Sequence, residues 1–363
     1  MARPLVAEIN LAALRNNYLL ARSQSAAATA IAVVKANAYG HGAVAVARSL
    51  ADLAPAFAVA CIEEANELVA AGIQQPIVLL EGFFTADELP RIVQHGYEFM
   101  LHNHWQLQQL TEFLATQSLQ PASINVWLKV DTGMHRLGFT LDEAEAVYRQ
   151  LRALPALHRI TLTSHLACAD EPGSQATVQQ LERFWQLQQR LNCPVSIANS
   201  PAILGWADAR QGQLRPGIML YGASPLPESH PLGSQLQPVM TLKSALISVR
   251  ELAAGESVGY GGRFTTSQPT RIGVVACGYG DGYPRHAQEG TPVLVKGVRC
   301  QLAGRVSMDM LTVDLSNCPD AAVGDEVELW GAHLPVNEVA RHCGTISYTL
   351  LTCLLPRVPR RYV

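Results

Sequence analysis

Short apolar runs alternate with segments of helical spacing through the first 237 residues, and this rhythm constrains the fold more than any other feature. Eight strand-like runs follow one another: Ala32–Val34, Phe57–Cys61, Ile77–Leu80, Glu98–Leu101, Ile124–Val130, Ile160–Ser164, Val195–Ala198 and Ile218–Tyr221. Segments with helical spacing lie between most of them, at Ile62–Ala71, Trp105–Thr116, Leu141–Leu154 and Val178–Leu191. Eight strands that alternate with helices predict an α/β fold, a (β/α)8 TIM-like barrel, rather than an open doubly wound sheet.

The rhythm stops near Pro238, where strand-like runs follow one another without helices between them. These runs are Thr241–Val249, Thr270–Gly278, Thr291–Val295, Arg299–Val306, Leu311–Leu315 and Glu326–Trp330. We therefore predict a barrel domain over residues 1–237 and a mostly β domain over residues 238–363. A linker rich in proline and glycine is expected from Ser224 to Gly233, and one helix, Val336–Arg341, is expected near the C-terminus.

The composition narrows the classes of function. With 48% hydrophobic and 16% charged residues, the chain has the apolar content of a large core. Its net charge is -3 and it has no basic stripe, which argues against a nucleic-acid partner. The eight cysteines are scattered without a C-x-x-C pair, which argues against a disulfide scaffold and against a metal site. Because neither a signal peptide nor a membrane-span run is found, we expect a soluble, cytoplasmic protein without a membrane partner.

The segment A-V-V-K-A-N-A-Y-G-H-G, residues 32–42, contains the first candidate for chemistry. Val33 and Val34 favour a strand, so Lys35 is expected at the carboxyl end of that strand. A poorly hydrated lysine loses its proton more easily than a surface lysine, and its amine can form a Schiff base with an aldehyde. An ordinary lysine with its head in water explains this segment equally well when the segment is taken alone.

Other polar residues of the first domain also follow predicted strands. They are Tyr39, the D-T-G-M-H-R segment from Asp131 to Arg136, His165, Asn199 and Ser200, together with Arg215 and Gly217 at the start of the eighth run. A barrel enzyme has its active site at the carboxyl ends of its strands and commonly binds phosphate after strands seven and eight. A reactive lysine combined with a phosphate pocket predicts pyridoxal phosphate as the cofactor.

Nine motifs, in order along nearly the whole chain, resemble those of the bacterial alanine racemases, pyridoxal-phosphate enzymes of fold type III. The motifs are A-V-V-K-A-N-A-Y-G-H-G, L-K-V-D-T-G-M-H-R-L-G, S-H-L-A-C-A-D, A-N-S-P, L-R-P-G-I-M-L-Y-G, V-G-Y-G-G, G-Y-G-D-G-Y-P-R, G-R-V-S-M-D-M and T-I-S-Y. The resemblance implies an isomerase that interconverts L- and D-alanine through two bases. It also implies a homodimer, in which the C-terminal domain of each subunit contributes to the active site of its partner.

The resemblance also implies roles for individual residues. Lys35 would carry the cofactor, and Tyr260 from the partner subunit would be the second catalytic residue. The remaining implied cofactor residues are Tyr39, Ser200, Gly217, Ile218 and Tyr348 at the phosphate, His165 and Arg215 at the ring, and Asn199 nearby. Arg136 and the backbone of Met308 would bind the substrate carboxylate, and Lys129 matches a lysine that carries a carbamate in many relatives.

Physical reasoning supports these roles. Racemisation needs one group that removes the α-proton on one face and another that delivers a proton on the opposite face. A free tyrosine titrates near ~10, so Tyr260 has to be tuned, which a hydrogen bond through His165 to Arg215 would do. An arginine cannot accept a proton from the ring nitrogen, so Arg215 should limit electron withdrawal and favour simple proton exchange.

Several alternatives stay open at this stage. A racemase of broader specificity, for example for serine, would have the same fold, although we expect such enzymes to have an export signal. A decarboxylase of the same fold would need an acidic group at the ring nitrogen, and a non-catalytic cofactor carrier would need no second domain. Asp131 is expected to order its loop rather than to act as an acid. The sequence leaves open whether D-alanine is made for peptidoglycan or L-alanine is supplied for catabolism.

Overall fold

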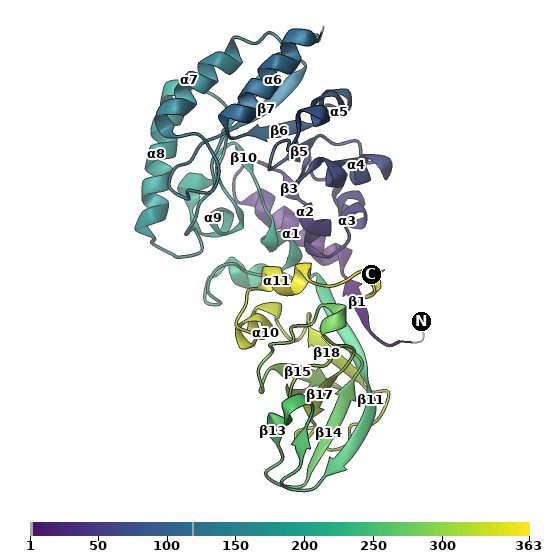
Figure 1. The fold of residues 1–363 in the computed structure, drawn as a ribbon. Helices are drawn as coiled ribbons and strands as arrows, with labels where there is room; N and C mark the ends of the chain where they lie inside the picture. The colour runs from purple at the N-terminus through teal and green to yellow at the C-terminus, as the bar shows by residue number, and fades with distance from the viewer. Residues whose placement is uncertain (1–2, 118–119) are drawn as a thin grey trace.

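The computed structural model describes residues 3–117 and 120–363 and has two lobes. The predicted domain ranges also include residues 1–2 and 118–119, which lie outside the described part. Figure 1 shows an α/β lobe above and a β-rich lobe below, and both ends of the chain lie near the junction between them. The two-domain architecture predicted from the sequence is therefore confirmed.

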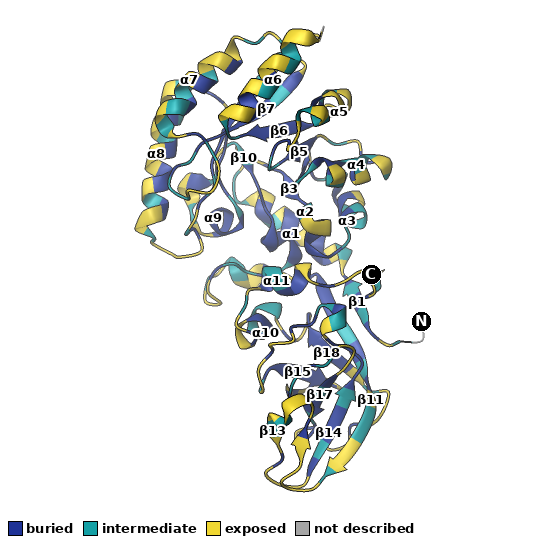
Figure 2. Ribbon diagram, in the orientation of Figure 1, coloured by how far each residue is buried: buried dark blue, intermediate teal, exposed yellow. Residues whose placement is uncertain are grey.

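Seven parallel strands form the sheet of the α/β lobe, and each strand pairs with the next along the chain. They are β3 (Ala32–Val33), β4 (Phe57–Val59), β5 (Ile77–Leu79), β6 (Glu98–Leu101), β7 (Ile124–Lys129), β8 (Leu157–Thr163) and β9 (Val195–Ser196). The helices around them are α1 (Leu11–Ser23), α2 (Lys35–Tyr39), α3 (Ala43–Leu50), α4 (Ile62–Ala70), α5 (Leu89–His95), α6 (His104–Thr116), α7 (Leu141–Arg152), α8 (Gln175–Leu191) and α9 (Ser200–Gly205). Most residues of these strands are buried, whereas the helices have exposed outer faces, as Figure 2 shows.

The eighth strand of the barrel is not the run that we predicted. Ile218–Tyr221 forms a 3-10 helix, η3, and the eighth position belongs to β10 (Gln213–Leu214), which pairs with β2 (Thr29–Ala30). Backbone hydrogen bonds close the ring, from the Arg215 amide to the Ala198 carbonyl at 2.9 Å and from the Ile31 amide to the Leu214 carbonyl at 2.8 Å. Arg215 therefore follows the eighth strand instead of opening it.

The β-rich lobe is built on an eight-stranded sheet in which most neighbouring strands run antiparallel. Its strands are β11 (Met240–Leu252), β14 (Thr270–Val275), β15 (Pro292–Val295), β16 (Val298–Leu302), β17 (Leu311–Asp314) and β18 (Glu326–Trp330), joined by β1 (Val6–Ile9) and β19 (Arg360–Tyr362). The long strand β11 pairs with β18 through its first half and with β14 through its second half, so six of the strands close on themselves. A small hairpin, β12 (Ser257–Val258) with β13 (Phe264–Thr265), lies beside them.

The first strand of the chain belongs to the second lobe, contrary to the prediction that residues 1–237 form one unit. Strand β1 pairs antiparallel with β11 and parallel with β19, so that both ends of the chain join one sheet. Two helices, α10 (Val336–His342) and α11 (Ser347–Thr352), pack at the junction. We predicted only α10, so α11, which includes Tyr348, is an addition.

Candidate active site

The mouth of the barrel has a cavity of about 620 Å³ at the carboxyl ends of its strands. Its lining residues are Val33, Lys35, Ala36, Tyr39, Leu80, Glu81, Met100, Lys129, Arg136, Leu137, His165, Asn199, Ser200, Pro201, Arg215, Gly217, Ile218, Tyr348 and Thr352. Eleven of the site residues proposed from the sequence line this cavity: Lys35, Tyr39, Lys129, Arg136, His165, Asn199, Ser200, Arg215, Gly217, Ile218 and Tyr348. Segments far apart in the sequence thus meet around Lys35.

Lys35 is followed by a turn of unusual backbone conformation. The next four residues, from Ala36 to Tyr39, all have φ between 52° and 53°, in the left-handed region that residues with a side chain rarely adopt. Such a conformation costs about 1–2 kcal/mol per residue and persists only where the surroundings impose it. The turn therefore has to be fixed by contacts outside itself.

Glu64 of α4 supplies one of these contacts. Its carboxylate accepts hydrogen bonds from the Ala36 amide at 2.6 Å and from the Ala60 amide at 2.8 Å. At the far end of the turn, His41 is fully buried and its Nδ1 lies 2.9 Å from the Tyr39 carbonyl. Burial lowers the pKa of His41 to about 4, so this ring is neutral and structural. Glu64 could not be predicted from the sequence, because nothing distinguishes it from other glutamates in the first turn of a helix.

A set of donors for an anion lies after β9 and β10. The Ser200 hydroxyl accepts hydrogen bonds from the Gly217 amide at 2.8 Å and from the Met219 amide at 3.3 Å. Tyr39 and Tyr348 line the same cavity, with their ring centroids 5.9 Å apart. Burial raises the pKa of Tyr39 to about 12 and raises the pKa of Tyr348, so both phenols keep their protons and can donate. Hydroxyl and amide donors of this kind favour a phosphate group.

Arg215 is buried at the floor of the cavity, and oxygens hold its guanidinium group. It donates hydrogen bonds to the hydroxyls of Thr163 and Ser196 and to the carbonyl of Ser164 at 2.7 Å. Burial lowers the pKa of Arg215 to about 10, which still leaves it a cation at neutral pH. No carboxylate within the described residues forms an ion pair with it. Thr163 and Ser196 are further residues that the sequence analysis did not identify as supports.

Two other groups, Lys129 and His165, lie in the positive potential of this cation. Burial, followed by repulsion from Arg215 and Arg136, lowers the pKa of Lys129 to about 7. Burial and repulsion from Arg215 lower the pKa of His165 well below its ordinary value, so the ring is neutral. The expected hydrogen bond from Arg215 to His165 is not formed within the described residues. The Nε2 atom of His165 lies instead 3.4 Å from the side-chain nitrogen, Nδ2, of Asn199.

The loop after β7 that leads to Arg136 is ordered from two sides. Asp131 accepts hydrogen bonds from the Gly133 amide at 2.9 Å and from the His135 amide at 3.1 Å. Burial works to raise the pKa of Asp131, but these hydrogen bonds outweigh it and the pKa is lowered. From α8, the buried Gln180 donates to the Thr132 hydroxyl at 3.1 Å. The loop-ordering role expected for Asp131 is confirmed.

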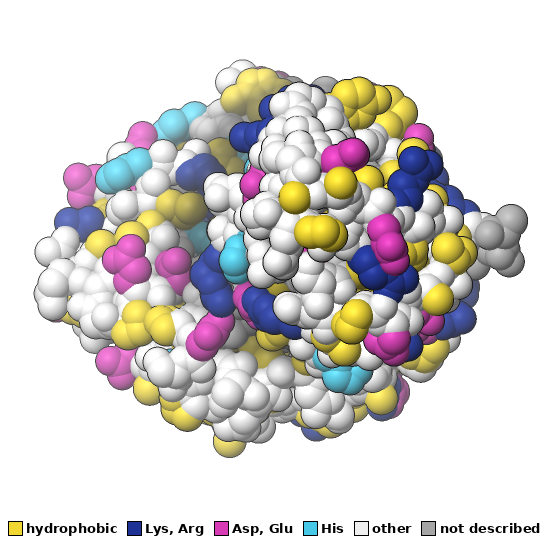
Figure 3. All heavy atoms as spheres, turned by 90° about the horizontal axis from the view of Figure 1, so that it is seen from below, with side chains coloured by type: hydrophobic (Ala, Val, Ile, Leu, Met, Phe, Trp, Pro, Cys, Tyr) yellow, Lys and Arg dark blue, Asp and Glu magenta, His cyan; other side chains and the backbone are white. Residues whose placement is uncertain are grey.

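Two of the proposed site residues do not reach the cavity of their own chain. Tyr260 is 68% exposed and Met308 is 53% exposed, both on the β-rich lobe. On the face of the molecule shown in Figure 3, hydrophobic, basic and acidic side chains are interspersed.

In the described part of the chain, no helix is both long and apolar enough to cross a membrane, and no group of three metal-ligating side chains is found.

A closed parallel barrel with reactive groups at the carboxyl ends of its strands defines a barrel enzyme, here one with an attached β domain. Comparison with known proteins identifies the family. Residues 9–225 match the model of the alanine racemase N-terminal domain, and residues 239–362 match the model of the alanine racemase C-terminal domain. The chain belongs to the alanine racemase family.

Individual relatives cover the chain from end to end. It is 57% identical to an alanine racemase from Chromohalobacter salexigens, over 100% of this chain and 98% of the relative. It is 52% identical to a catabolic alanine racemase from Pseudomonas aeruginosa, over 99% of both chains. The crystal structure of the biosynthetic alanine racemase from the same organism superimposes with a TM-score of 0.95 at 51% identity, over 99% of each chain. An alanine racemase from Bartonella henselae, solved with covalently bound pyridoxal phosphate, has a TM-score of 0.91 at 31% identity and covers 100% of both chains.

Proposed function

We propose that this chain interconverts L- and D-alanine with pyridoxal phosphate, using Lys35 and Tyr260 as the two groups that transfer protons. The observation that carries the proposal is the surroundings of Lys35. It shares one cavity with the anion donors at Ser200 and Gly217 and with the buried cation Arg215. The proposal is further supported by 57% identity to an alanine racemase over the full length of the chain.

The residues around the cavity fit this cofactor. A Cβ atom at Gly217 would lie 2.7 Å from the Tyr39 hydroxyl, so glycine keeps open the space between the donors. Gly217, Ser200, Tyr39, Ile218 and Tyr348 would hold the phosphate. His165, Asn199 and Arg215 would lie around the ring, and Lys35 would join the aldehyde. These neutral hydroxyl and backbone groups would hold the phosphate through hydrogen bonds to its oxygens.

Bound pyridoxal phosphate supplies an aldehyde that joins to amino groups and a ring that acidifies the proton on the adjacent carbon. The protein supplies the rest. On one face of the substrate, the Nζ atom of Lys35 takes or returns the proton of the α-carbon. On the opposite face, the hydroxyl oxygen of Tyr260 does the same. The α-proton of L-alanine and that of D-alanine lie on opposite faces. The group that removes the proton from one enantiomer is therefore the group that delivers it when the reaction runs the other way.

Tyr260 would come from a second copy of the chain. It is 68% exposed on the β-rich lobe and does not line the cavity that holds Lys35. A symmetric dimer in which each β-rich lobe faces the partner's barrel gives every site one lysine and one tyrosine. The same arrangement would bring the backbone of Met308 of the partner subunit to the substrate carboxylate, together with Arg136.

Arg215 and His165 would limit the chemistry to proton exchange. Arg215 cannot accept a proton, and burial together with the positive charge of Arg215 keeps His165 neutral. A ring that stays unprotonated withdraws fewer electrons, so decarboxylation and transamination are suppressed. Lys129, whose amine is about half neutral near pH 7, would react in its neutral form with carbon dioxide to form a carbamate. The resulting anion would pair with Arg136 and orient it.

Progress curves from both enantiomers test the proposed reaction. Pure protein with pyridoxal phosphate is incubated with L-alanine or with D-alanine, and both isomers are measured by chiral chromatography. Because the enantiomers have equal free energy in water, both curves should converge on an equal mixture, with equal kcat/KM in the two directions. Lys35→Ala should abolish conversion, whereas the exposed Lys296→Ala serves as a matched control that keeps it. Loss of alanine as carbon dioxide, or no conversion by cofactor-loaded protein, would overturn the proposal.

A panel that includes serine and larger amino acids addresses the breadth of the substrate range. Relatives described as catabolic and as biosynthetic match at 52% and 51% identity, so the proposal is restricted to the reaction itself. The homodimer and the cytoplasmic location are also part of the proposal, and the support for them is membership of the alanine racemase family.

A further inference from the structure

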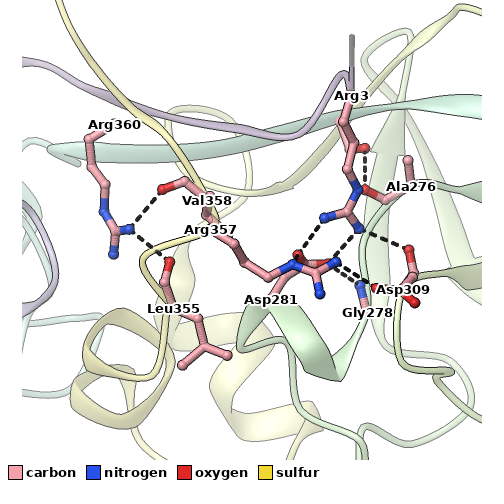
Figure 4. A network of polar contacts seen from close by, with 10 residues as sticks. Arg3, Ala276, Gly278, Asp281, Asp309, Leu355, Arg357, Val358 and Arg360 are labelled. Carbon is pink, nitrogen blue, oxygen red and sulfur yellow. Dashed lines mark hydrogen bonds and ion pairs between the residues drawn. The ribbon is translucent and has the colours of Figure 1, made fainter. Parts of the chain in front are cut away.

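A buried carboxylate in the β-rich lobe has no part in the site described so far. Asp281 lies in the turn after β14, and its side chain is fully buried. Two arginines hold it, as Figure 4 shows: Arg3 donates to both carboxylate oxygens, at 2.5 and 2.7 Å, and Arg357 places its Nε atom 2.8 Å from Oδ1. Arg3 precedes β1 and Arg357 precedes β19, so the two ends of the chain converge on one carboxylate.

The turn of Asp281 rests directly on the backbone of Ser307 and Met308. The Tyr279 amide donates to the Ser307 carbonyl at 3.0 Å, and the Gly280 amide donates to the Met308 carbonyl at 2.7 Å. A Cβ atom at the preceding residue, Gly278, would lie 2.3 Å from the Ser307 carbonyl oxygen, so only glycine allows this approach. The spacing of the G-Y-G-D-G-Y motif is thereby explained by backbone packing against Met308.

The same arginines also hold the residue after Met308. Arg3 donates to the Asp309 carbonyl at 3.0 Å, and Arg357 pairs with the Asp309 carboxylate at 2.5 Å. Met308 is therefore fixed from both sides, through its own carbonyl and through its neighbour. Its amide has no acceptor among the residues that the structure describes, and its side chain is 53% exposed. A rigid support thus presents a free backbone donor at the surface.

The charges of this cluster balance. Asp281 and Asp309 face Arg3 and Arg357, so the cost of burying Asp281 is offset by two cations and by the Gly278 amide at 2.9 Å. A buried ion pair is often no more stabilising than an apolar pair of the same shape. The directed hydrogen bonds of this cluster instead fix the geometry of the chain, here the position of the Met308 backbone.

We propose that Asp281, with Arg3 and Arg357, is a positioning residue that holds the Met308 amide where the partner subunit's site needs a donor for the substrate carboxylate. This inference rests on the proposed function. The carboxylate is bound in the same way before and during proton transfer, because it does not react. Loosening Met308 should therefore weaken substrate binding while leaving the rate of the bound substrate nearly unchanged.

Three variants test the inference. Arg3→Met and Arg357→Met each remove one cation and leave the other, so the fold should survive, and Asp281→Asn removes the charge that both arginines share. Arg299→Met is the matched control, because Arg299 is a similarly exposed arginine of the same lobe that pairs with Glu338. For each variant, kcat and KM for alanine are measured in both directions, with dimer content measured by sedimentation velocity at the assay concentration.

We expect KM to rise several-fold in each arginine variant and about tenfold in Asp281→Asn, with kcat within about twofold of the parent and the dimer intact. Arg3→Lys should restore only part of the KM, since an ammonium group cannot make the two parallel hydrogen bonds. The control should match the parent. An unchanged KM in folded dimers, a loss confined to kcat, or dissociation into monomers as the source of the loss would each overturn the inference. An inactive parent enzyme would instead refute the proposed function, so the two failures are distinguishable.

Discussion

The hydroxyl of Ser200 and the amide of Gly217, 2.8 Å apart, join the segments that follow β9 and β10. The first residue of one short helix thus meets the residue before another, which fixes the two segments that would hold the phosphate to each other at one side of the cavity. Predictions for the proposed cofactor follow from this geometry.

Gly217→Ala should weaken cofactor binding. The new Cβ atom would lie 2.7 Å from the Tyr39 hydroxyl, so a phosphate donor has to move. We expect the dissociation constant of pyridoxal phosphate, measured by fluorescence titration of the apoprotein, to rise about tenfold, or about 1.4 kcal/mol. Gly205→Ala is the control, because its Cβ atom would lie 3.5 Å from Leu226 in ordinary contact. Equal affinities in the two variants would exclude this phosphate site.

Lys35 should be the single point of covalent attachment. Borohydride treatment of the cofactor-loaded protein should fix one pyridoxyl group, and peptide mapping should find it on Lys35, which lines the cavity. Lys243, paired with Glu8, and the exposed Lys296 should remain unlabelled. Label on either of these lysines, or an unlabelled Lys35 in a protein that binds the cofactor, contradicts the assignment.

Lys129 should make the stability of the folded chain depend on pH and on bicarbonate. Its pKa is lowered from 10.5 to about 7, so the unfolded chain takes up a proton between these values and the folded chain does not. Without modification, stability is therefore lost as the pH falls from about 10.5 to about 7. A carbamate removes the buried amine, so bicarbonate should raise Tm at pH 8.

Carbon NMR with labelled bicarbonate tests for the modification of Lys129 directly. A carbamate resonance should appear in the parent and be missing in Lys129→Met, whose Tm should not respond to bicarbonate. A crystal structure that ends in a bare amine at Lys129, with no anion bridging to Arg136, would refute the prediction.

Arg215→Glu should change the outcome of the reaction. A carboxylate near the ring nitrogen favours its protonation, which strengthens electron withdrawal. We expect racemisation to drop and the formation of pyruvate from alanine, measured with lactate dehydrogenase, to rise relative to it. Because Arg215 donates to Thr163, Ser196 and Ser164, folding of the variant is checked by its melting temperature. A folded variant that racemises alanine at the parental rate without pyruvate would exclude the ring role.

Hybrid dimers test whether Tyr260 acts in the partner's site. Lys35→Ala and Tyr260→Ala should each be inactive, but a dimer of one of each has one intact site. With random exchange about half of the dimers are hybrids, so activity should recover to about a quarter of the parental rate per site. The control is the same mixing without subunit exchange. Proven exchange without recovery would place Tyr260 outside the partner's site.

The sequence predicts the strands and helices whose apolar pattern is local. The run Ile218–Tyr221 forms a 3-10 helix and not the predicted strand, because a short, wholly apolar run after Pro216 and Gly217 fits a strand or a turn of helix equally. Strand β1 was misplaced for a different reason. Its partner, β11, lies beyond the whole barrel, and no local spacing indicates a pairing of that range.

The motifs of the site predict most of the residues that line the cavity, because most of them lie at or after the end of a predicted strand, whereas Tyr348 is predicted by the resemblance alone. They do not predict the supports. Gln180 has the same appearance in the sequence as the other glutamines of α8, yet it alone is buried against the loops of Thr132 and His165. Glu64 and Asp281 act through backbone amides and distant arginines, which become visible only when the chain is folded.

The pairing of β1 with β11 has a consequence for biogenesis. As the chain leaves the ribosome, β1 emerges first but has no strand to pair with until the entire barrel has been synthesised. The barrel can gather its local strand–helix units during synthesis, whereas the second sheet has to wait for its last strand, β19. Strand β1 thus has both of its neighbouring strands only after β19 has been made. A polypeptide that stops before β11 keeps β1 as an unpaired strand, whose free edge can pair with other chains and promote aggregation.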